Sequence, residues 1–294
     1  MPHILAIGIA TVDIVNEVAE YPAEDSEVRA LGQRIARGGN ATNTLAVLSQ
    51  LGHACSWGGV IAEDADSAHI LADLAAHRID VRLCRREPQG KNPVSYILLS
   101  RATGSRSIVH YRDLPEFGYA DFAAIDLAAF DWLHFEGRNV AETRRMLELA
   151  RERKPRLPIS VEIEKPRPEI EALLPWADLL LFSRAYAQAH GHHDARELFA
   201  AVRPQAPQAD LVCSWGAVGA WASDAGGRVY ASPAFPPERV IDTLGAGDTF
   251  NAGFIDARLR GLALAEALEA ACRLAGHKCG QAGLTGLGAV GGYA

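Results

Sequence analysis

The alternation of short apolar runs with amphipathic stretches constrains the fold of this chain most strongly. Runs rich in Ile, Val and Leu occur at residues 4–9, 132–135, 159–163, 179–182 and 211–214. Helical periodicity occupies the intervals at residues 41–51, 68–76, 141–153, 195–202 and 263–275. Strands that alternate with helices favour a parallel sheet covered on both faces. We therefore expect a three-layer α/β/α fold with a mainly parallel central sheet.

One segment interrupts this alternation. Two extended runs, Val94–Ser100 and Ser105–Tyr111, flank a turn that contains Gly104. A hairpin of this kind does not fit a parallel βαβ layer, so it predicts a small antiparallel β lid. The polar, irregular stretch at 15–33 is expected to add a further strand. We place the lid at about 11–35 and 90–115 of a single domain spanning 1–294, because no repeat or linker divides the chain.

Composition and charge exclude several classes of protein. The chain has 294 residues, of which 49% are hydrophobic and 22% are charged, as in ordinary globular proteins. Its net charge of -7 repels polyanions, which disfavours nucleic-acid binding. No window approaches about 18 uninterrupted apolar residues, so we expect no membrane segment. The five cysteines form no C-x-x-C pair, which is typical of reduced thiols in a cytoplasmic protein.

A glycine-rich turn near the C-terminus predicts an anion site. Gly245, Ala246 and Gly247 allow a tight bend and begin a helix that runs to about Arg260. The free N–H groups and the positive dipole at such a helix start favour a phosphate group. Asp248 lies in the first turn, where a carboxylate beside a phosphate can accept a hydroxyl proton. The alternative is a plain turn followed by an N-terminal helix acid.

A second glycine turn, Gly38-Gly39, enters another helix near the N-terminus. Asn40 is expected to cap that helix, and Asn43 to project near the same end. Asp13, placed at the carboxyl end of the first predicted strand, would lie beside them, because ligands of α/β sheets collect at that edge. Two amides and a glycine backbone suit sugar hydroxyls. The alternative is a capped helix with a solvated asparagine.

Together these two motifs resemble the two signatures of the ribokinase, or phosphofructokinase-B, family of sugar kinases. The resemblance covers nearly the whole chain and is strongest to the ketohexokinase branch. Four further segments carry it: Tyr21–Glu27, His134–Asn139, Val161–Pro166 and Lys278–Gly280. The resemblance implies a ribokinase-like fold and transfer of the γ-phosphate of ATP to a ketose hydroxyl, in that branch the 1-hydroxyl of fructose.

The resemblance also implies roles for single residues. Asp248 would be the base, and Gly245, Ala246 and Gly247 the anion hole. The sugar would be held by Asp248 together with Asp13, Gly39, Asn40 and Asn43. The nucleotide would be held by Arg106 on the lid, by the anion hole, and by Gly216, Ala217, Val218, Gly219 and Cys279.

For cofactors and assembly the resemblance implies ATP as phosphate donor, Mg²⁺, and K⁺ as a hypothesis near the Asp242-Thr243 loop. Glu136 and Glu164 are candidates for the Mg²⁺ site, whose protein contacts stay unassigned. Relatives dimerise through the lid, so we expect a homodimer in which Asp25 reaches the partner's sugar site.

Two departures from related sequences matter. The stretch Ser183–Tyr186 lacks the Asn-x-x-Glu motif of many ribokinases, as does the ketohexokinase branch. Ala217 and Val218 stand where that branch has acidic residues, so nucleotide preference can differ. The alternatives are another fructokinase, a ribokinase, a nucleoside kinase, a 2-keto-3-deoxygluconate kinase, or a sugar-binding sensor without catalysis.

Overall fold

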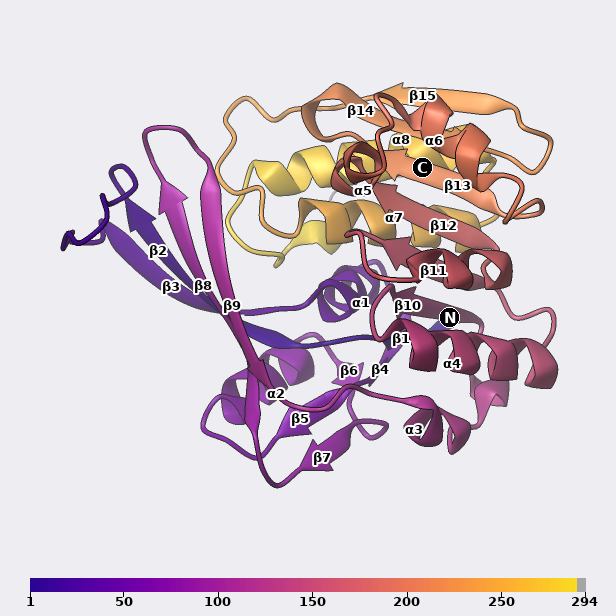
Figure 1. Ribbon diagram of the computed structural model, residues 1–294, viewed down its shortest axis with the longest axis horizontal. Coiled ribbons are helices and arrows are strands. Elements are labelled where there is room, and N and C mark those ends of the chain that lie inside the picture. The colour runs from indigo at the N-terminus through magenta and orange to yellow at the C-terminus, as the bar shows by residue number, and fades with distance from the viewer. Residues whose placement is uncertain (290–294) are drawn as a thin grey trace.

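The computed structural model describes residues 1–289, and its centre is a nine-stranded sheet (Figure 1). Seven neighbouring strands are parallel, and β14 and β15 complete one edge in antiparallel pairing. In spatial order the strands are β15 (Val229–Pro233), β14 (Gly219–Ser223), β13 (Asp210–Ser214), β12 (Leu179–Ser183), β11 (Ile159–Ile163), β10 (Trp132–Glu136), β1 (His3–Ile7), β4 (Ala54–Gly58) and β6 (Ile79–Asp80).

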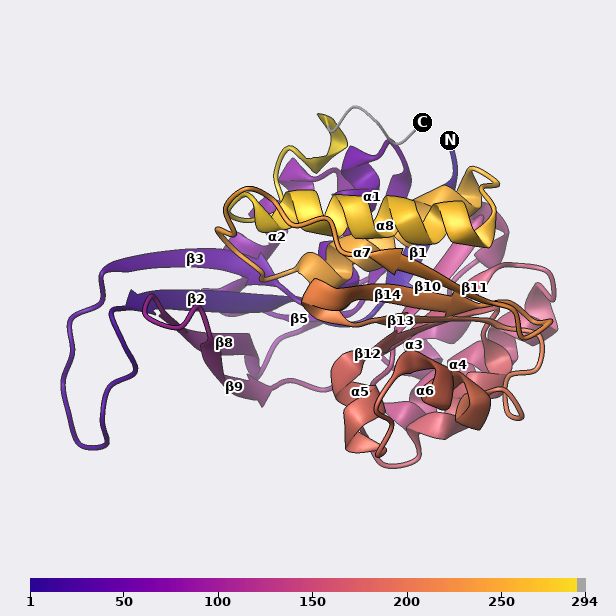
Figure 2. The ribbon, with the colours of Figure 1, turned by 90° about the horizontal axis from the view of Figure 1, so that it is seen from above.

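Helices cover both faces of this sheet (Figure 2). One face carries α1 (Asn40–Gln50), α2 (Ser67–Ala76), α7 (Ala246–Leu259) and α8 (Leu264–Cys279). The other carries α3 (Tyr119–Ala123), α4 (Val140–Arg153), α5 (Arg184–Ala189) and α6 (Ala195–Val202), with short 3-10 turns at 127–129, 170–176, 216–218 and 287–289 elsewhere in the described chain. The three-layer prediction is therefore confirmed.

The layers form because successive strand residues point to opposite faces of the sheet. In β1, Ile4 and Ala6 belong to the core beneath α1, α7 and α8, whereas Leu5 and Ile7 belong to the core beneath α4 and α6. Near-continuous apolar strands therefore contribute side chains to both cores, as the sequence predicts. The antiparallel β14 and β15 were not predicted, because no apolar run distinguishes them.

A second, four-stranded sheet extends from the body as the lid (Figure 1). Its strands in spatial order are β3 (Gly32–Gly38), β2 (Thr11–Val18), β8 (Lys91–Ser100) and β9 (Arg106–Asp113). The hairpin β8–β9 and the pair β2–β3 are antiparallel, while β2 and β8 pair in parallel. The segment at 15–33, which was expected to add one strand, contains the end of β2, the loop after it and the start of β3.

Two smaller features complete the described chain. Strands β5 (Val60–Ala62) and β7 (Arg85–Glu87) pair in parallel near the base of the lid. Within residues 1–289, no helix is long and apolar enough to cross a bilayer.

Candidate active site

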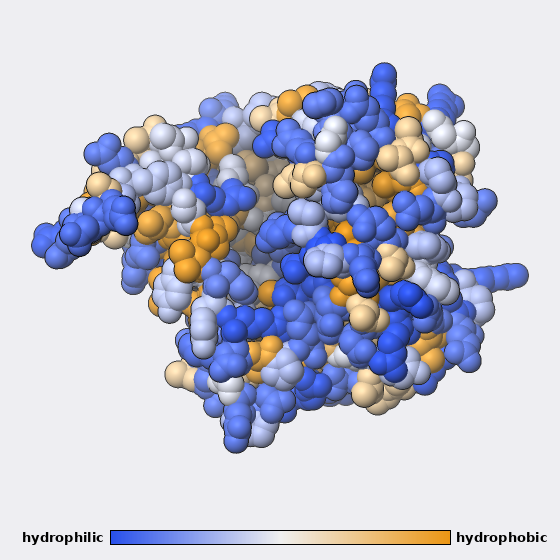
Figure 3. Space-filling model, viewed as in Figure 1, coloured by the Kyte–Doolittle hydropathy of each residue, from blue (hydrophilic) through white to orange (hydrophobic). Residues whose placement is uncertain are grey.

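Two cavities lie along the edge of the sheet where the parallel strands end. The first has a volume of about 510 Å³ and lies between the lid and the strand ends. The second has a volume of about 440 Å³ and lies beside α7 and α8. Both are lined by Arg106, Ser214, Thr243 and Gly247, so the two cavities meet there. Figure 3 shows the hollow between lid and body. Carboxyl ends of parallel strands are where α/β proteins bind ligands.

All five residues expected to hold the sugar line the first cavity: Asp13, Gly39, Asn40, Asn43 and Asp248. The prediction that Asp13 lies at the carboxyl end of the first strand is wrong. The chain leaves β1 after Ile7 and enters the lid, so Asp13 is the third residue of β2. Its Oδ1 accepts a hydrogen bond of 2.8 Å from Thr11 Oγ1. The lid therefore carries one wall of the cavity.

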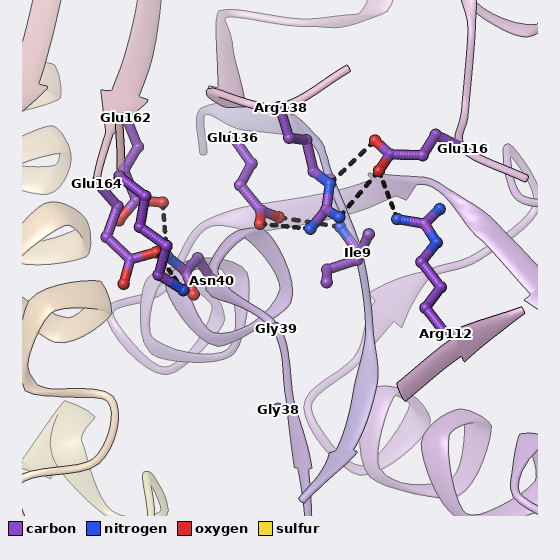
Figure 4. A network of polar contacts seen from close by, with 12 residues as sticks. Ile9, Gly38, Gly39, Asn40, Arg112, Glu116, Glu136, Arg138, Glu162 and Glu164 are labelled. Carbon is purple, nitrogen blue, oxygen red and sulfur yellow. Dashed lines mark hydrogen bonds and ion pairs between the residues drawn. The ribbon is translucent and has the colours of Figure 1, made fainter. Parts of the chain in front are cut away.

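The start of α1 differs from the expectation that Asn40 caps the helix. Gly39 is the capping residue, and Asn40 is the first helical residue. Gly39 takes φ of +103°, which disfavours residues with a side chain, and a Cβ there would overlap the carbonyl oxygen of Ile9. The Asn40 amide is therefore released from capping. It donates to Glu162 at 3.1 Å and to Glu164 at 3.0 Å (Figure 4).

Asp248 lies in the first turn of α7, where it is buried and faces α1. Its Oδ2 accepts a 2.7 Å hydrogen bond from Asn43 Nδ2. These two residues are 205 positions apart in the sequence and come from the two separate glycine motifs. Packing of α1 against α7 thus joins both motifs at one point.

The surroundings of Asp248 bring its pKa close to neutral pH. Burial raises the pKa of Asp248 to about 7, and the carboxylates of Glu164 and Glu136 act in the same direction. The Asn43 hydrogen bond and the Arg37 charge oppose that rise in pKa. Burial, Asp248 and Glu164 likewise hold the pKa of Glu162 well above its ordinary value.

The beginning of α7 has the geometry of an anion site. Gly245 precedes the helix with φ of +76°, and Ala246 and Gly247 form its first residues. Gly245 and Gly247 line the first cavity, and Ala246 and Gly247 line the second. The N–H groups of a helix's first turn have no intrahelical acceptor, and they carry the positive end of the helix dipole. A phosphate at the junction of the cavities would meet these donors.

The second cavity brings together most of the predicted nucleotide residues. Gly216, Ala217, Gly219 and Cys279 line it, although they come from a 3-10 turn, β14 and the end of α8. Val218 does not line this cavity: it is 59% exposed, because the turn at 216–218 points it outward. The lid residue Arg106 lies between the cavities, and its Nη1 donates to Thr243 Oγ1 at 3.2 Å.

Three site residues were not singled out from the sequence. Glu162 of β11 lines the first cavity, and its Oε1 accepts a 3.0 Å hydrogen bond from Asn251 Nδ2. Asn251 follows Asp248 by three positions in α7, a spacing that places both on one helix face. This spacing is the sequence signal by which Asn251 could have been placed beside Asp248. Arg37 precedes the first glycine pair, but nothing local shows that its side chain is buried.

An ion-pair network supports the opposite end of the first cavity (Figure 4). Arg138 donates to Glu136 at 2.9 Å and to both oxygens of Glu116, and Arg112 from β9 also donates to Glu116. Glu136 accepts from the backbone N–H of Ile9 at 3.0 Å. The network ties the base of the lid to β10.

The metal candidates Glu136 and Glu164 both line the first cavity. Among residues 1–289, however, no group of three or more His, Cys, Asp or Glu side chains is arranged to hold a metal ion. Mg²⁺ commonly binds through substrate phosphates, waters and one or two carboxylates. Glu136 and Glu164 fit this mode of Mg²⁺ binding, in which the protein supplies only one or two of the ligands.

Comparison with known proteins identifies the family. Residues 1–287 match the model of the pfkB family carbohydrate kinases. The chain belongs to this family. The chain is therefore an ATP-dependent sugar kinase.

Two curated relatives support this assignment. Ketohexokinase from Mus musculus is 39% identical to this pfkB kinase over 293 residues, covering 97% of the chain and 98% of the relative. Fructosamine kinase FrlD from Bacillus subtilis is 28% identical over 258 residues, covering 85% and 86%. Among solved structures, Arabidopsis thaliana ribokinase complexed with ribose and ATP superposes with a TM-score of 0.79 at 19% identity, over 96% of this kinase and 94% of that chain. The ribokinase-like fold of this pfkB kinase is therefore confirmed.

Proposed function

We propose that this pfkB kinase phosphorylates a ketose, with fructose as acceptor and fructose 1-phosphate as product. The observation that carries the proposal is Asp248, which lines one polar cavity with Asp13, Asn40 and Asn43. It directly follows Gly247, which that cavity shares with the cavity beside α8. The 39% identity to a ketohexokinase supports the choice of acceptor.

In the proposed mechanism Asp248 orients the sugar hydroxyl and takes its proton as the phosphoryl group is transferred. Transfer passes through a loose transition state, so catalysis depends mainly on alignment and on stabilising the equatorial oxygens. The backbone N–H groups at Gly245, Ala246 and Gly247 would meet that developing charge. Transfer of this kind needs no strong base, so Asp248 has only to orient the hydroxyl and accept its proton late in the step.

The lid has a role in the proposed nucleotide site. Arg106 would reach the phosphates of ATP from β9, because it lies between the two cavities. A guanidinium suits phosphate oxygens through paired hydrogen bonds. Gly216, Ala217, Gly219 and Cys279 would bound the rest of the nucleotide. Val218 is expected to contribute no side-chain contact.

Mg²⁺ would be held chiefly by the ATP phosphates, with Glu136 or Glu164 as a nearby carboxylate, and it would neutralise phosphate charge. K⁺ dependence near the Asp242-Thr243 loop stays a prediction. The carboxylate of Asp242 is already engaged by Arg34 at 2.9 Å and by Lys278 at 3.2 Å. Equal rates in K⁺ and in tetramethylammonium would contradict the K⁺ hypothesis.

We further infer that the chain acts as one domain that dimerises through its lid in the cytoplasm. On the outer face of the lid, Ile35, Ile14, Tyr96 and Val109 are cross-strand partners in one row over all four strands. Three of them are more than 45% exposed. Asp25 lies in the exposed loop between β2 and β3 and does not line the first cavity of its own chain, as a residue offered to a partner would.

The substrate experiment is a panel assay. ADP release from Mg-ATP would be measured with fructose, other ketoses, ribose, glucose, 2-keto-3-deoxygluconate and adenosine, and NMR would identify the phosphorylated position. Fructose 1-phosphate as the best product would support the proposal. Preference for another acceptor would retain the kinase chemistry and overturn the assignment of fructose, and sugar binding without turnover would favour a sensor.

A further inference from the structure

Arg37, the residue before the first glycine pair, is a buried cation beside the proposed base's hydrogen-bond partner. It belongs to β3, and its side chain is only 2% exposed. Its Nη1 donates to Asn43 Oδ1 at 2.8 Å and to Thr42 Oγ1 at 2.9 Å. Its Nε pairs with Asp73 of α2 at 2.5 Å. Burying a cation is costly, and the Asp73 carboxylate offsets part of that cost.

The hydrogen bonds of Arg37 determine which way the Asn43 amide faces. A guanidinium can only donate, and a carboxylate can only accept when ionised. Asn43 therefore turns its oxygen toward Arg37 and its NH₂ group toward Asp248. The reversed amide would bring NH₂ against the Arg37 donors and its oxygen against the Asp248 carboxylate, which are two repulsive contacts.

We propose that Arg37 is a positioning residue that holds the Asn43 amide in the orientation needed to anchor Asp248. The inference rests on the proposed role of Asp248 as base. Asn43 occupies Asp248 Oδ2, and no hydrogen bond from the described residues reaches Oδ1. Oδ1 is then left for the sugar hydroxyl. The second N–H of the Asn43 amide can point to the sugar itself, so Arg37 prepares both contacts.

Charge adds to this geometry. The cavity around Asp248 is lined by the carboxylates of Asp13, Glu136, Glu162 and Glu164. Its basic side chains come from the lid and from the segments after β10 and β11: Arg106, His110, Arg112, Arg138, Lys165 and Arg167. Arg37 lies outside this lining, behind Asn43. Arg37 lowers the pKa of Asp248 against those carboxylates. Removing its charge should raise the pKa of Asp248 further, so the acidic limb of the rate profile should move to higher pH.

The test compares Arg37→Gln and Arg37→Lys with the unmodified kinase, using fructose and Mg-ATP from about pH 5.5 to about pH 9, a range that spans the raised pKa of Asp248. For Arg37→Gln we expect kcat to fall about tenfold or more, KM for fructose to rise, KM for ATP to stay unchanged, and the acidic limb to move up by about half a pH unit. Arg37→Lys keeps the charge but not the fork of donors. We therefore expect its limb to stay in place while kcat falls.

A matched control separates positioning from stability. Arg203 is a half-buried arginine that binds the carbonyl oxygens of Ala206 and Ala209 and lines neither cavity. Arg203→Gln should lower Tm and leave kcat and the limb unchanged. An unmoved limb with unchanged KM for fructose in Arg37→Gln would overturn the inference. If Arg37→Gln does not fold, normal kcat and KM in Arg37→Lys would overturn it.

Failure of the inference can be told apart from failure of the proposed function. Asp248→Asn with near-normal turnover would remove the proposed base itself. An inactive Asp248→Asn combined with an unmoved limb and an unchanged KM for fructose in Arg37→Gln would overturn only the role of Arg37. Should fructose not be phosphorylated, the best acceptor of the panel takes its place in the same experiment.

Discussion

Asp248 shows how strongly a single residue depends on its surroundings. An exposed aspartate has a pKa of about 3.9 and is a poor proton acceptor at neutral pH. Burial among carboxylates raises the pKa of this one to about 7. A general base is most effective when its pKa lies near the working pH. The residue type was evident from the sequence, whereas this matching of pKa to pH was not.

The pH dependence of kcat follows from that pKa. Asp248 must be ionised to accept a proton, so kcat should rise about tenfold per pH unit below about pH 7 and level off above it. Steady-state rates at saturating fructose and ATP between about pH 5 and about pH 9 measure this dependence. A profile that stays flat across the acidic half of this range would contradict a base with a raised pKa.

Asp248→Asn should lower kcat by at least about 100-fold while leaving ATP binding nearly intact, because the amide cannot take the proton. The control is Asp256→Asn, another buried acid of α7, which pairs with His53 and Arg260 instead of facing a cavity. That control should lose stability and keep its kcat. Turnover of Asp248→Asn within about tenfold of the unmodified kinase would remove Asp248 from the base role.

The same substitution should make the protein more stable at about pH 8, above the raised pKa. A carboxyl whose folded pKa is raised is disfavoured in its ionised form, so stability falls as pH rises from about 4 to about 7. The substituted amide carries no charge and escapes this penalty. We expect a higher Tm at about pH 8 and a gain that shrinks toward about pH 5, measured by calorimetry. An equal Tm difference at both pH values would argue against a raised pKa.

At the scale of elements, α1 is positioned by its two glycine ends. Gly39 and Gly52 both have positive φ, +103° and +95°. At Gly39 an added Cβ would also overlap the backbone at Ile9, whereas at Gly52 nothing lies within 4 Å. Gly39 lines the first cavity, and Gly52 does not. Substitution of Gly52 therefore tests backbone strain alone, whereas substitution of Gly39 tests strain together with displacement of the cavity wall.

Gly39→Ala should destabilise the protein by about 2 kcal/mol or more and raise KM for the sugar at least about tenfold, since α1 must shift away from Ile9. Gly52→Ala should cost about 1 kcal/mol from strain alone and leave KM unchanged. Urea unfolding and steady-state kinetics measure both variants. Equal effects on KM would contradict a specific role for the Gly39 end.

The two faces of the lid sheet have different surroundings. Alternate residues of its strands point to opposite faces, so Asp13, Ile97 and Arg106 face the cavities while Tyr96 and Val109 face outward. The hairpin was predictable because its two extended runs and turn are contiguous. The parallel pairing of β2 with β8 was not, because these strands lie far apart in the sequence and meet only when both leave the body together.

For the whole molecule, the exposed row on the lid predicts a homodimer. Contiguous exposed apolar side chains commonly mark an interaction surface. Val109→Asp should convert a dimer to a monomer, measured by light scattering after gel filtration. Val229→Asp, a similar change on β15 at the far edge of the sheet, should leave the dimer intact. A monomeric unmodified protein at micromolar concentration would contradict the prediction.

Local patterns along the chain predict the layers and the sheet edge at which the candidate site lies. Periodicity of apolar residues is a local property, so it predicts strands, helices and the sheet edge at which they end. Glycine turns before Asn40 and before Ala246 are equally local, because they reflect backbone angles that other residues avoid.

The contacts of those residues depend instead on tertiary packing. Asn43 meets Asp248 across 205 positions, and Asn40 meets Glu162 across 122. Such pairings depend on how α1 packs against α7 and the central strands. Burial of Arg37 and the raised pKa of Asp248 follow from the same packing. Desolvation and long-range charge act through space, so no local pattern in the chain encodes them.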